Sequence, residues 1–219
     1  MTAVEMQYDF DSKIRSHKKL SGLNIASSDI QRFLNNAQEE LIRKHSALFN
    51  DETESVKYLT PLVRTIVRNS TQAFSDSTNV EGGLYIKLPD DVKYTLMERI
   101  TQTSNFIIYQ ARIKDITMAF YNLNYLNPYK NPYKDEIWRL VYGLDSTSTT
   151  SIVHQLILAV GFIFNYYKLT YITYPSVIDI NTNTTCQLDK TIHPELVNLA
   201  VELAVESYSK SNTMDEKKN

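Results

Sequence analysis

Apolar residues recur at helical spacing near the start of the chain. Met6, Phe10 and Ile14 are four residues apart, which predicts a first helix over residues 3–17. A stronger pattern follows, in which Ser28 and Gln31 have the spacing of a capping box at a helix start. This second helix has its apolar positions at Ile30, Phe33, Leu34, Ala37, Leu41 and Leu48, and its polar positions, which we expect outside, at Asn35, Asn36, Glu39, Glu40, Arg43 and Lys44.

The pattern then changes to short runs of β-branched and aromatic residues, which predict strands. The segment Pro89-Asp90-Asp91 is expected to begin a turn or helical segment, and the apolar run 152–164 is compatible with either a strand or a buried helix. The predicted strands of this middle part are 62–67, 84–88, 106–109, 116–120 and 137–143.

The segment 165–174 is dense in tyrosine and threonine and is followed by Pro175, which suits a long strand that ends at a residue unable to donate to a ladder. A second short strand is predicted at 177–180. Pro194 then fits the first turn of a last helix that we expect to end at Tyr208.

That last helix has an unusually narrow polar stripe. Asn198, Glu202 and Glu206 are four residues apart, and the rest of its circumference is Leu, Val and Ala. Two explanations remain open: the helix is wrapped by its own domain, or it packs between its own domain and a neighbouring copy. The second explanation makes Val197, Val201 and Val205 candidate interface residues.

A doubled Asn-Pro-Tyr motif lies between two of the predicted strands. The residue before a proline is pushed out of the α region, so residues 127–133 are expected to form a rigid extended turn with two exposed tyrosines. The candidate contact residues of this turn are Asn127, Pro128, Tyr129, Pro132 and Tyr133.

These elements predict an α+β fold, in which the terminal helices pack together and the strands of a β-rich middle project from them or cover them. We expect one domain over residues 1–208 and a flexible polar tail over 209–219. With 219 residues, 42% of them hydrophobic and 22% charged, the chain is long enough and apolar enough to be globular.

Charge and cysteine content narrow the function classes. A net charge of −2 argues against a dedicated nucleic-acid binder. The single cysteine, Cys186, excludes an internal disulfide and is expected to be a small buried residue. The sequence has neither a secretory signal pattern nor an apolar run long enough to cross a membrane, which predicts a protein kept in the cytoplasm in which it is made.

Catalytic chemistry has no residue pattern to support it. The four histidines, His17, His45, His154 and His193, have no metal-ligand spacing, and Gly82-Gly83 lacks the spacing of a phosphate loop. We therefore predict no catalytic residue, no cofactor and no metal site.

Three blocks of residues together resemble a known family. They are the Phe33-Leu34-Asn35 helix, the Asn-Pro-Tyr turn followed by Trp138-Arg139-Leu140, and the Tyr174-Pro175 strand end followed by Ile192-His193-Pro194 and the Ala/Val helix. These blocks resemble the connector ring proteins, or tail adaptors, of crAss-like Bacteroidales phages, and more remotely the tubular tail adaptors of short-tailed phages. Trp138, Arg139, Tyr174, Pro175 and His193 become candidate interface residues through this resemblance.

The resemblance implies a structural virion protein with a tail-adaptor-like fold. About twelve copies would form a head-to-tail ring below the portal at the portal vertex, assembled in the bacterial host cytoplasm, with the portal and further tail proteins as partners and phage DNA passing through the lumen without sequence-specific binding. The sequence departs from the relatives before Pro175, where Lys168 is the one nearby cation, which puts a phosphate contact at this turn in doubt.

Two other classes compete with the ring protein. One is a soluble, non-enzymatic binding module that uses the 127–133 turn to hold a ligand. The other is a small hydrolase, for which the sequence offers no named residue.

Overall fold

The structure is a computed structural model that describes residues 1–16, 25–69, 83–124, 127, 129–144 and 152–215. The chain divides into two compact units. Unit 1 comprises Met1–Val63 and Tyr174–Asn219, and unit 2 comprises Arg64–Thr173. The prediction of a single domain over residues 1–208 stays a prediction.

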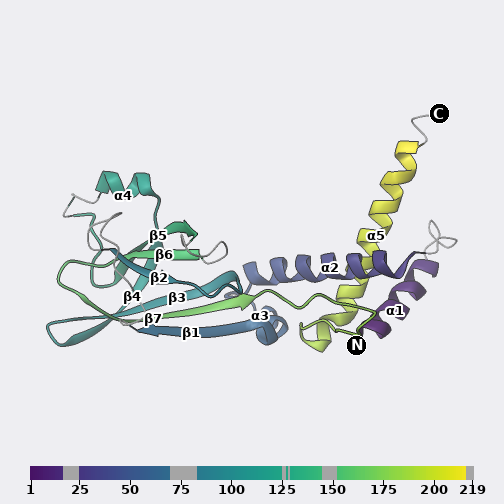
Figure 1. Cartoon of the computed structure of the whole chain (residues 1–219), viewed down its shortest axis with the longest axis horizontal. Coiled ribbons are helices and arrows are strands. Elements are labelled where there is room, and N and C mark those ends of the chain that lie inside the picture. The colour runs from purple at the N-terminus through teal and green to yellow at the C-terminus, as the bar shows by residue number, and fades with distance from the viewer. Residues whose placement is uncertain (17–24, 70–82, 125–126, 128, 145–151, 216–219) are drawn as a thin grey trace. The chain divides into compact units, whose positions relative to one another are not determined.

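In chain order, helices precede and follow a run of strands, which Figure 1 labels. The α+β class with helices at both ends is thus confirmed. In chain order the elements are α1 (Ala3–Ser16), α2 (Ser27–Ala47), α3 (Thr53–Leu59), a 3₁₀ turn (Thr60–Leu62), β1 (Val63–Asn69), β2 (Gly83–Lys87), β3 (Val92–Ser104), β4 (Ile107–Asp115), α4 (Met118–Asn124), β5 (Glu136–Leu144), β6 (Ile152–Ile157), β7 (Ile163–Thr173), a second 3₁₀ turn (Lys190–Ile192) and α5 (His193–Asp215).

Unit 1 is a helical bundle made from both ends of the sequence. Met6, Phe10 and Ile14 of α1 are buried, as their spacing predicted, and α1 and α2 both pack against α5 (Figure 1). Phe33 joins the three helices: its ring stacks on Phe10 with 6.4 Å between centroids and lies 6.2 Å from the ring of Tyr208.

The predicted capping box at Ser28 is wrong. The N-cap of α2 is Ala26, which has extended backbone angles and makes no side-chain cap. Its carbonyl already accepts the first helical hydrogen bonds, from Asp29 and Ile30, so Ser28 lies inside the first turn and cannot cap it. Asp29 remains in that first turn, where a negative charge is favourable.

The predicted short strand at 177–180 is also wrong. Only Asp179 forms a bridge, with Thr184. Side chains of α2 take the place of a strand partner here: Asn35 bonds both backbone groups of Ile178, and the Gln38 amide donates to the carbonyl of Ser176.

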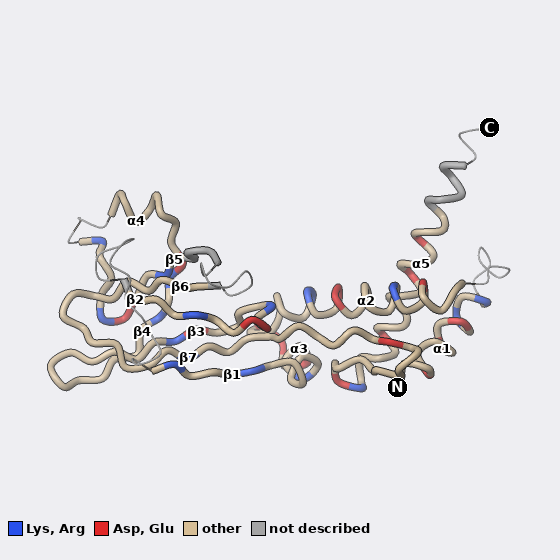
Figure 2. The backbone as a smooth tube through the Cα atoms, in the orientation of Figure 1, with Lys and Arg blue, Asp and Glu red and all other residues tan. Residues whose placement is uncertain are grey.

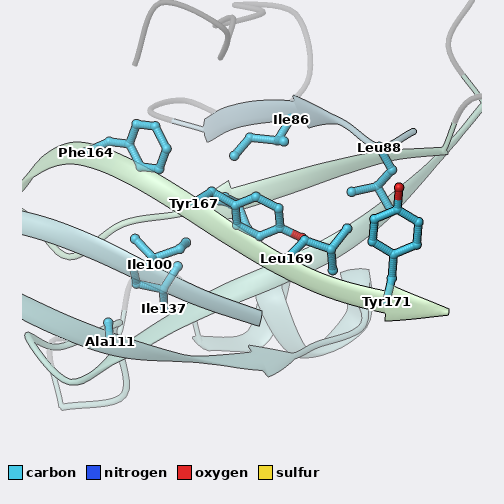
Figure 3. Packing of buried hydrophobic residues seen from close by; sticks show 10 residues of the cluster. Ile86, Leu88, Ile100, Ala111, Ile137, Phe164, Tyr167, Leu169 and Tyr171 are labelled. Carbon is cyan, nitrogen blue, oxygen red and sulfur yellow. The ribbon is translucent and has the colours of Figure 1, made fainter. Parts of the chain in front are cut away.

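Unit 2 is built on one seven-stranded sheet with the order β1-β7-β3-β4-β5-β6-β2. Neighbours with known register run antiparallel except β4 and β5, which are parallel and are joined by the crossover that contains α4. One face of the sheet holds the main core (Figure 3), in which side chains from β2 to β7 converge: Ile86, Leu88, Ile100, Ala111, Ile137, Leu156, Phe164, Tyr167, Leu169 and Tyr171.

The opposite face of the sheet has a smaller core. It consists of Tyr121, Trp138, Leu140 and Ile157, so α4 covers β5 and β6 on this side. The Phe120 and Trp138 rings meet edge to face at 5.3 Å.

The predicted strand at 116–120 is wrong, because its residues begin α4. The Thr117 side chain accepts from the Phe120 backbone N–H, and this cap starts a helix whose apolar side faces Trp138. Asp90 and Asp91 form a turn that leads directly into β3 rather than into a helical segment.

Residues 152–164, for which a strand and a buried helix were both open, belong to two strands. β6 and β7 are separated by a turn at Gly161, whose φ of +81° suits glycine. The last helix, in turn, continues to Asp215 rather than ending at Tyr208. A flexible tail over 209–219 stays a prediction, and residues 216–219 lie outside the described part of the chain.

Candidate assembly surfaces

The Asn-Pro-Tyr segment forms a turn that presents two tyrosines to solvent. Tyr129 is 95% exposed and Tyr133 is 66% exposed, as the doubled motif predicted. Asn127 holds the turn: its side-chain oxygen accepts from Tyr129 N–H at 3.0 Å, and its carbonyl accepts from Lys130 N–H. Pro132 is half-buried, and Pro128 lies outside the described residues.

Trp138 and Arg139 lie inside unit 2 rather than at its surface. Trp138 is 1% exposed, and its indole N–H donates to Glu136. The Arg139 side chain is 11% exposed and forms ion pairs with Glu98 and Asp115. An interface role for these two residues stays a prediction, and their observed contacts stabilise the fold of unit 2.

Glu98 is the centre of a buried polar network that the sequence did not indicate. Its carboxylate pairs with Arg139, accepts from the Tyr167 hydroxyl, and lies 3.0 Å from Nδ1 of His154. Burial alone would raise the pKa of Glu98, but the hydrogen bond from His154, the charge of Arg139 and the hydrogen bond from Tyr167 outweigh it and lower the pKa.

The same network shifts the pKa values of two partners of Glu98, Tyr167 and Arg139. Burial and the adjacent Glu98 charge raise the pKa of Tyr167. Burial would lower the pKa of Arg139, but the carboxylates of Glu98 and Asp115 raise it. Each of these groups is thus held in its ordinary neutral-pH ionisation state, as in a structural ion pair and unlike an acid or base tuned for catalysis. Only the register of β3, β5, β6 and β7 brings these side chains together, which is why no local motif signals them.

His193 begins α5 and is 2% exposed. Its Nε2 lies 3.1 Å from the carbonyl oxygen of Leu188, and its Nδ1 lies 3.0 Å from the amino nitrogen of Met1. Burial lowers the pKa of His193. This neutral ring links the loop before α5 to the start of α1, and its role at an interface stays a prediction.

Helix α5 is covered on one side only. Leu196, Val197, Ala200 and Ala204 are buried within unit 1, whereas the Leu and Val residues beside the polar stripe remain partly exposed. These partly exposed residues are Leu199, Val201, Leu203 and Val205. The structure thereby places two of the three predicted valines where a neighbour can contact them, together with Tyr174, which is 59% exposed, and the half-buried Pro175.

A groove of about 380 Å³ runs along this side of unit 1 between α2 and α5. Its lining has three glutamates and one lysine, so its formal charge is −2. Lys44 pairs with Glu195 at 3.1 Å, and Arg43 pairs with Glu40 at its rim. We call this surface the acidic groove; its lining residues are Glu40, Leu41, Lys44, Glu195, Asn198, Leu199 and Glu202.

A third exposed surface lies where two hairpins of unit 2 turn. The β3–β4 and β6–β7 turns lie at the same end of the sheet (Figure 1), and the Tyr109 and Phe162 rings meet at 5.5 Å. We call the exposed apolar residues there the hairpin-tip patch: Phe106, Ile107, Ile108, Val160 and Ile163. Residues 106–109 have the composition of a strand, although the polar Ser104-Asn105 pair before Phe106 is a turn signal.

Within the described ranges, no group of three or more His, Cys, Asp or Glu side chains could hold a metal ion. Over the same residues, no helix is both long enough and apolar enough to span a membrane.

The fold and these surfaces define an α+β protein whose distinctive features are exposed contact surfaces and buried structural networks. Comparison with known proteins agrees: residues 1–216 match the family described as phage tail ring protein 3/4. The chain belongs to this family, and it is therefore a structural ring protein of a phage particle.

A curated relative is the "Ring protein 4/5" of Bacteroides phage crAss001, which is 27% identical to this chain over 136 residues. The match covers 55% of this chain and 54% of the relative, so it spans about half the length of each. The resemblance inferred from the sequence blocks to the ring proteins of crAss-like phages is confirmed.

Proposed function

We propose that this protein is the subunit of a head-to-tail connector, or adaptor, ring that lies below the portal and through which the phage genome is packaged, retained and ejected. The observation that carries the proposal is the family match over residues 1–216, which includes both units. By resemblance the ring has about twelve copies, its neighbours are the portal and further tail proteins, and DNA passes its lumen without sequence-specific contacts.

The surfaces of the molecule support such an assembly. A cyclic ring needs two different contact faces on each subunit, because one face of a copy meets another face of the next. Unit 1 offers the open side of α5 and the acidic groove, and unit 2 offers the hairpin-tip patch. Permanent assemblies bury roughly 2,000 Å² or more at an interface, and exposed apolar side chains of this kind supply such area.

The deciding experiment is electron microscopy of purified virions, with subunit counting at the portal vertex. A closed ring of this chain directly below the portal is the expected result. A ring farther along the tail would contradict the adaptor position, and absence of the chain from virions would contradict the whole proposal.

One observation favours a second candidate, a binding module that uses the 127–133 turn. Tyr129 and Tyr133 are both largely exposed, and exposed tyrosines are common at recognition surfaces. The double substitution Tyr129→Ala and Tyr133→Ala separates the two functions. If subunits of this variant still enter virion rings, the turn is free for a ligand; if they do not, the turn belongs to the assembly.

A further inference from the structure

Three cations lie directly opposite one another on adjacent strands of unit 2. Arg99 of β3 is in register with Arg112 of β4 on one side and with Lys168 of β7 on the other. Directly opposite residues project from the same face of a sheet, so the three side chains form one row. All three are exposed, and no ion pair within the described part of the chain involves any of them.

This basic row is unfavourable for the isolated chain. Neighbouring strands are about 4.8 Å apart, and like charges directly opposite one another destabilise a sheet. Glu136 follows Arg112 in the register, but its carboxylate also accepts from Lys114 and from the Trp138 indole. Figure 2 shows cations on β3, β4 and β7 in blue.

The three side chains of the basic row are exposed on their face of the sheet. The helix α4 covers β5 and β6 on this side of the sheet, through Trp138 and Leu140. That cover reaches β4 at Lys114, two residues beyond Arg112, because the Lys114 ammonium lies 5.3 Å from the centre of the Phe120 ring.

Apolar side chains continue this face toward the hairpin turns. Thr103 is in register with Ile108 and with Ile163, and these two isoleucines are 69% and 70% exposed. Residues 99, 101 and 103 of β3 alternate with the core-facing positions, so the isoleucines and the basic row lie on the same face, with the buried Thr101 between them. Beyond them lies Phe106, which is fully exposed.

The acidic groove of unit 1 has the complementary chemistry. It has a formal charge of −2, and the partly exposed Leu199 lies among its acids. In the described residues Glu202 has no ion pair, whereas Glu40 and Glu195 are already paired. One surface therefore combines cations with aliphatic side chains, and the other combines carboxylates with a leucine.

We propose that the basic row and the hairpin-tip patch of one copy dock onto the acidic groove and α5 flank of the next copy. The contact is heterologous and so propagates from subunit to subunit, which is the geometry a ring requires. This inference rests on the proposed ring and names the two faces that form it. Opposite charges across the contact set its register and exclude the like-charged alternatives, in which two basic rows or two grooves would meet.

A second copy fits this surface better than a nucleic acid does. Phosphate binding requires cations, but it gives no reason for exposed isoleucines beside them. The net charge of the chain, −2, is also opposite to that of a nucleic-acid binder. Nucleic-acid binding is thus the competing outcome of the test.

The test uses disulfide trapping between two full-length chains. One chain has Ile108→Cys and the other has Leu199→Cys; the native Cys186 is buried. The chains are mixed at high concentration and low salt and then oxidised. We expect covalent heterodimers, and the matched control replaces Ile108→Cys by Val67→Cys, a 55% exposed position on β1 that should give few of them.

Charge reversal then tests the register. Adding Arg99→Glu to the first chain, or Glu202→Lys to the second, should each reduce the trapped fraction by about tenfold, because like charges then face each other. Combining both reversals should restore most of it. Circular dichroism of each variant verifies that it is folded. Equal trapping at Val67→Cys, or no restoration by the double reversal, would overturn the proposal.

Binding of duplex DNA tests the alternative that the basic row binds nucleic acid. If Arg99→Glu abolishes salt-sensitive binding of a DNA duplex but leaves trapping unchanged, the row serves nucleic acid and the docking proposal is wrong. The outcomes separate from those of the ring proposal. If virions contain a ring of this chain but positions 108 and 199 are not trapped, only the proposed docking faces are wrong. If these positions are trapped but the chain is absent from virions, only the proposed connector function is wrong.

Discussion

The side chain of Asn35 holds both backbone polar groups of Ile178. Its amide nitrogen donates to the Ile178 carbonyl at 2.9 Å, and its oxygen accepts from the Ile178 N–H at 2.8 Å. Ile178 is fully buried, so these groups would otherwise lose their partners in the interior of unit 1. One residue of α2 thereby does for this segment what a neighbouring strand does in a sheet.

We expect Asn35→Ala to destabilise unit 1 by about 1–3 kcal/mol, because it leaves a buried backbone donor and acceptor unsatisfied. Urea unfolding followed by circular dichroism measures the change. The matched control is Asn36→Ala, since Asn36 is the same residue type on the same helix but is exposed; its effect should stay within about 0.5 kcal/mol. Equal effects of the two substitutions would contradict the pinning role of Asn35.

Glu98→Gln should destabilise unit 2 by about 3 kcal/mol, because it removes the buried carboxylate partner of Arg139 and leaves the exposed Asp115 as its remaining counter-ion. Denaturant unfolding of the two proteins gives the difference. Glu40→Gln removes an exposed helix pair with Arg43 and should cost less than about 1 kcal/mol. A Glu98 variant as stable as the Glu40 variant would show that the network contributes little.

Acidification from pH 8 to pH 5.5 should destabilise the protein partly through His193. Burial lowers the pKa of His193 in the folded chain, so the unfolded chain binds this proton more readily as the pH falls through about 6.5. This contribution to stability is present above about pH 6.5 and is lost as the pH falls from there toward the lowered pKa of His193 in the folded chain.

The variant His193→Gln removes this titration while keeping an N–H for the Leu188 carbonyl. Its unfolding free energy should therefore fall less between the two pH values than that of the unmodified chain. His45, whose pKa burial also lowers, contributes equally to both proteins and serves as an internal background. An identical pH dependence of the two proteins would exclude His193 as a contributor.

The Cys186 thiol should react slowly in the folded chain. Burial raises the pKa of Cys186 to about 11, so almost none of it is the reactive thiolate at neutral pH. With a chromogenic disulfide reagent at pH 7.5, we expect a rate about 100-fold lower than in denaturant, where the thiol regains an ordinary pKa. Comparable rates in the two conditions would place Cys186 at the surface.

Phe106 occupies a turn position that suits glycine. Asn105 and Phe106 have φ values of +49° and +64°, and a bulky side chain in this region costs about 1–2 kcal/mol. Phe106→Gly should therefore raise the unfolding free energy by about 1 kcal/mol, measured by thermal unfolding. Phe106→Ala keeps the backbone penalty and should give no such gain. If glycine and alanine stabilise the chain equally, the backbone angle is not the cause.

Helices with long amphipathic patterns were predictable from the sequence. Met6, Phe10 and Ile14 are buried as their spacing indicated, and the strand that Pro175 follows ends at Thr173. The exposure of Tyr129 and Tyr133 was also predictable, because two Asn-Pro steps restrict the local backbone. These successes concern properties set by neighbours in the sequence.

The capping-box error at Ser28 was local, since the N-cap is Ala26, but the other errors occurred where contacts with another element decide the structure. Residues 177–180 have strand composition, but the side chains that bond them come from α2, more than 130 positions earlier in the chain. Residues 116–120 have strand composition too, but the Thr117 cap and the cover over Trp138 make them helical. The Glu98 network and the basic row depend on strand register, which no single-sequence pattern specifies.

The arrangement of unit 1 has a consequence for the order in which the chain matures on the ribosome. Its first helices and its last one are separated by Arg64–Thr173, the whole of unit 2. At about 5–20 residues per second, translation of these 110 residues takes roughly 5 to 20 seconds. During that interval α5 is not yet available to pack against Phe10 and Phe33, while unit 2 can already fold. A message truncated before α5 thus yields a product with a folded sheet and an incomplete helical bundle with exposed apolar residues, whereas a subunit gains its α5 surface only after α5 has been synthesised.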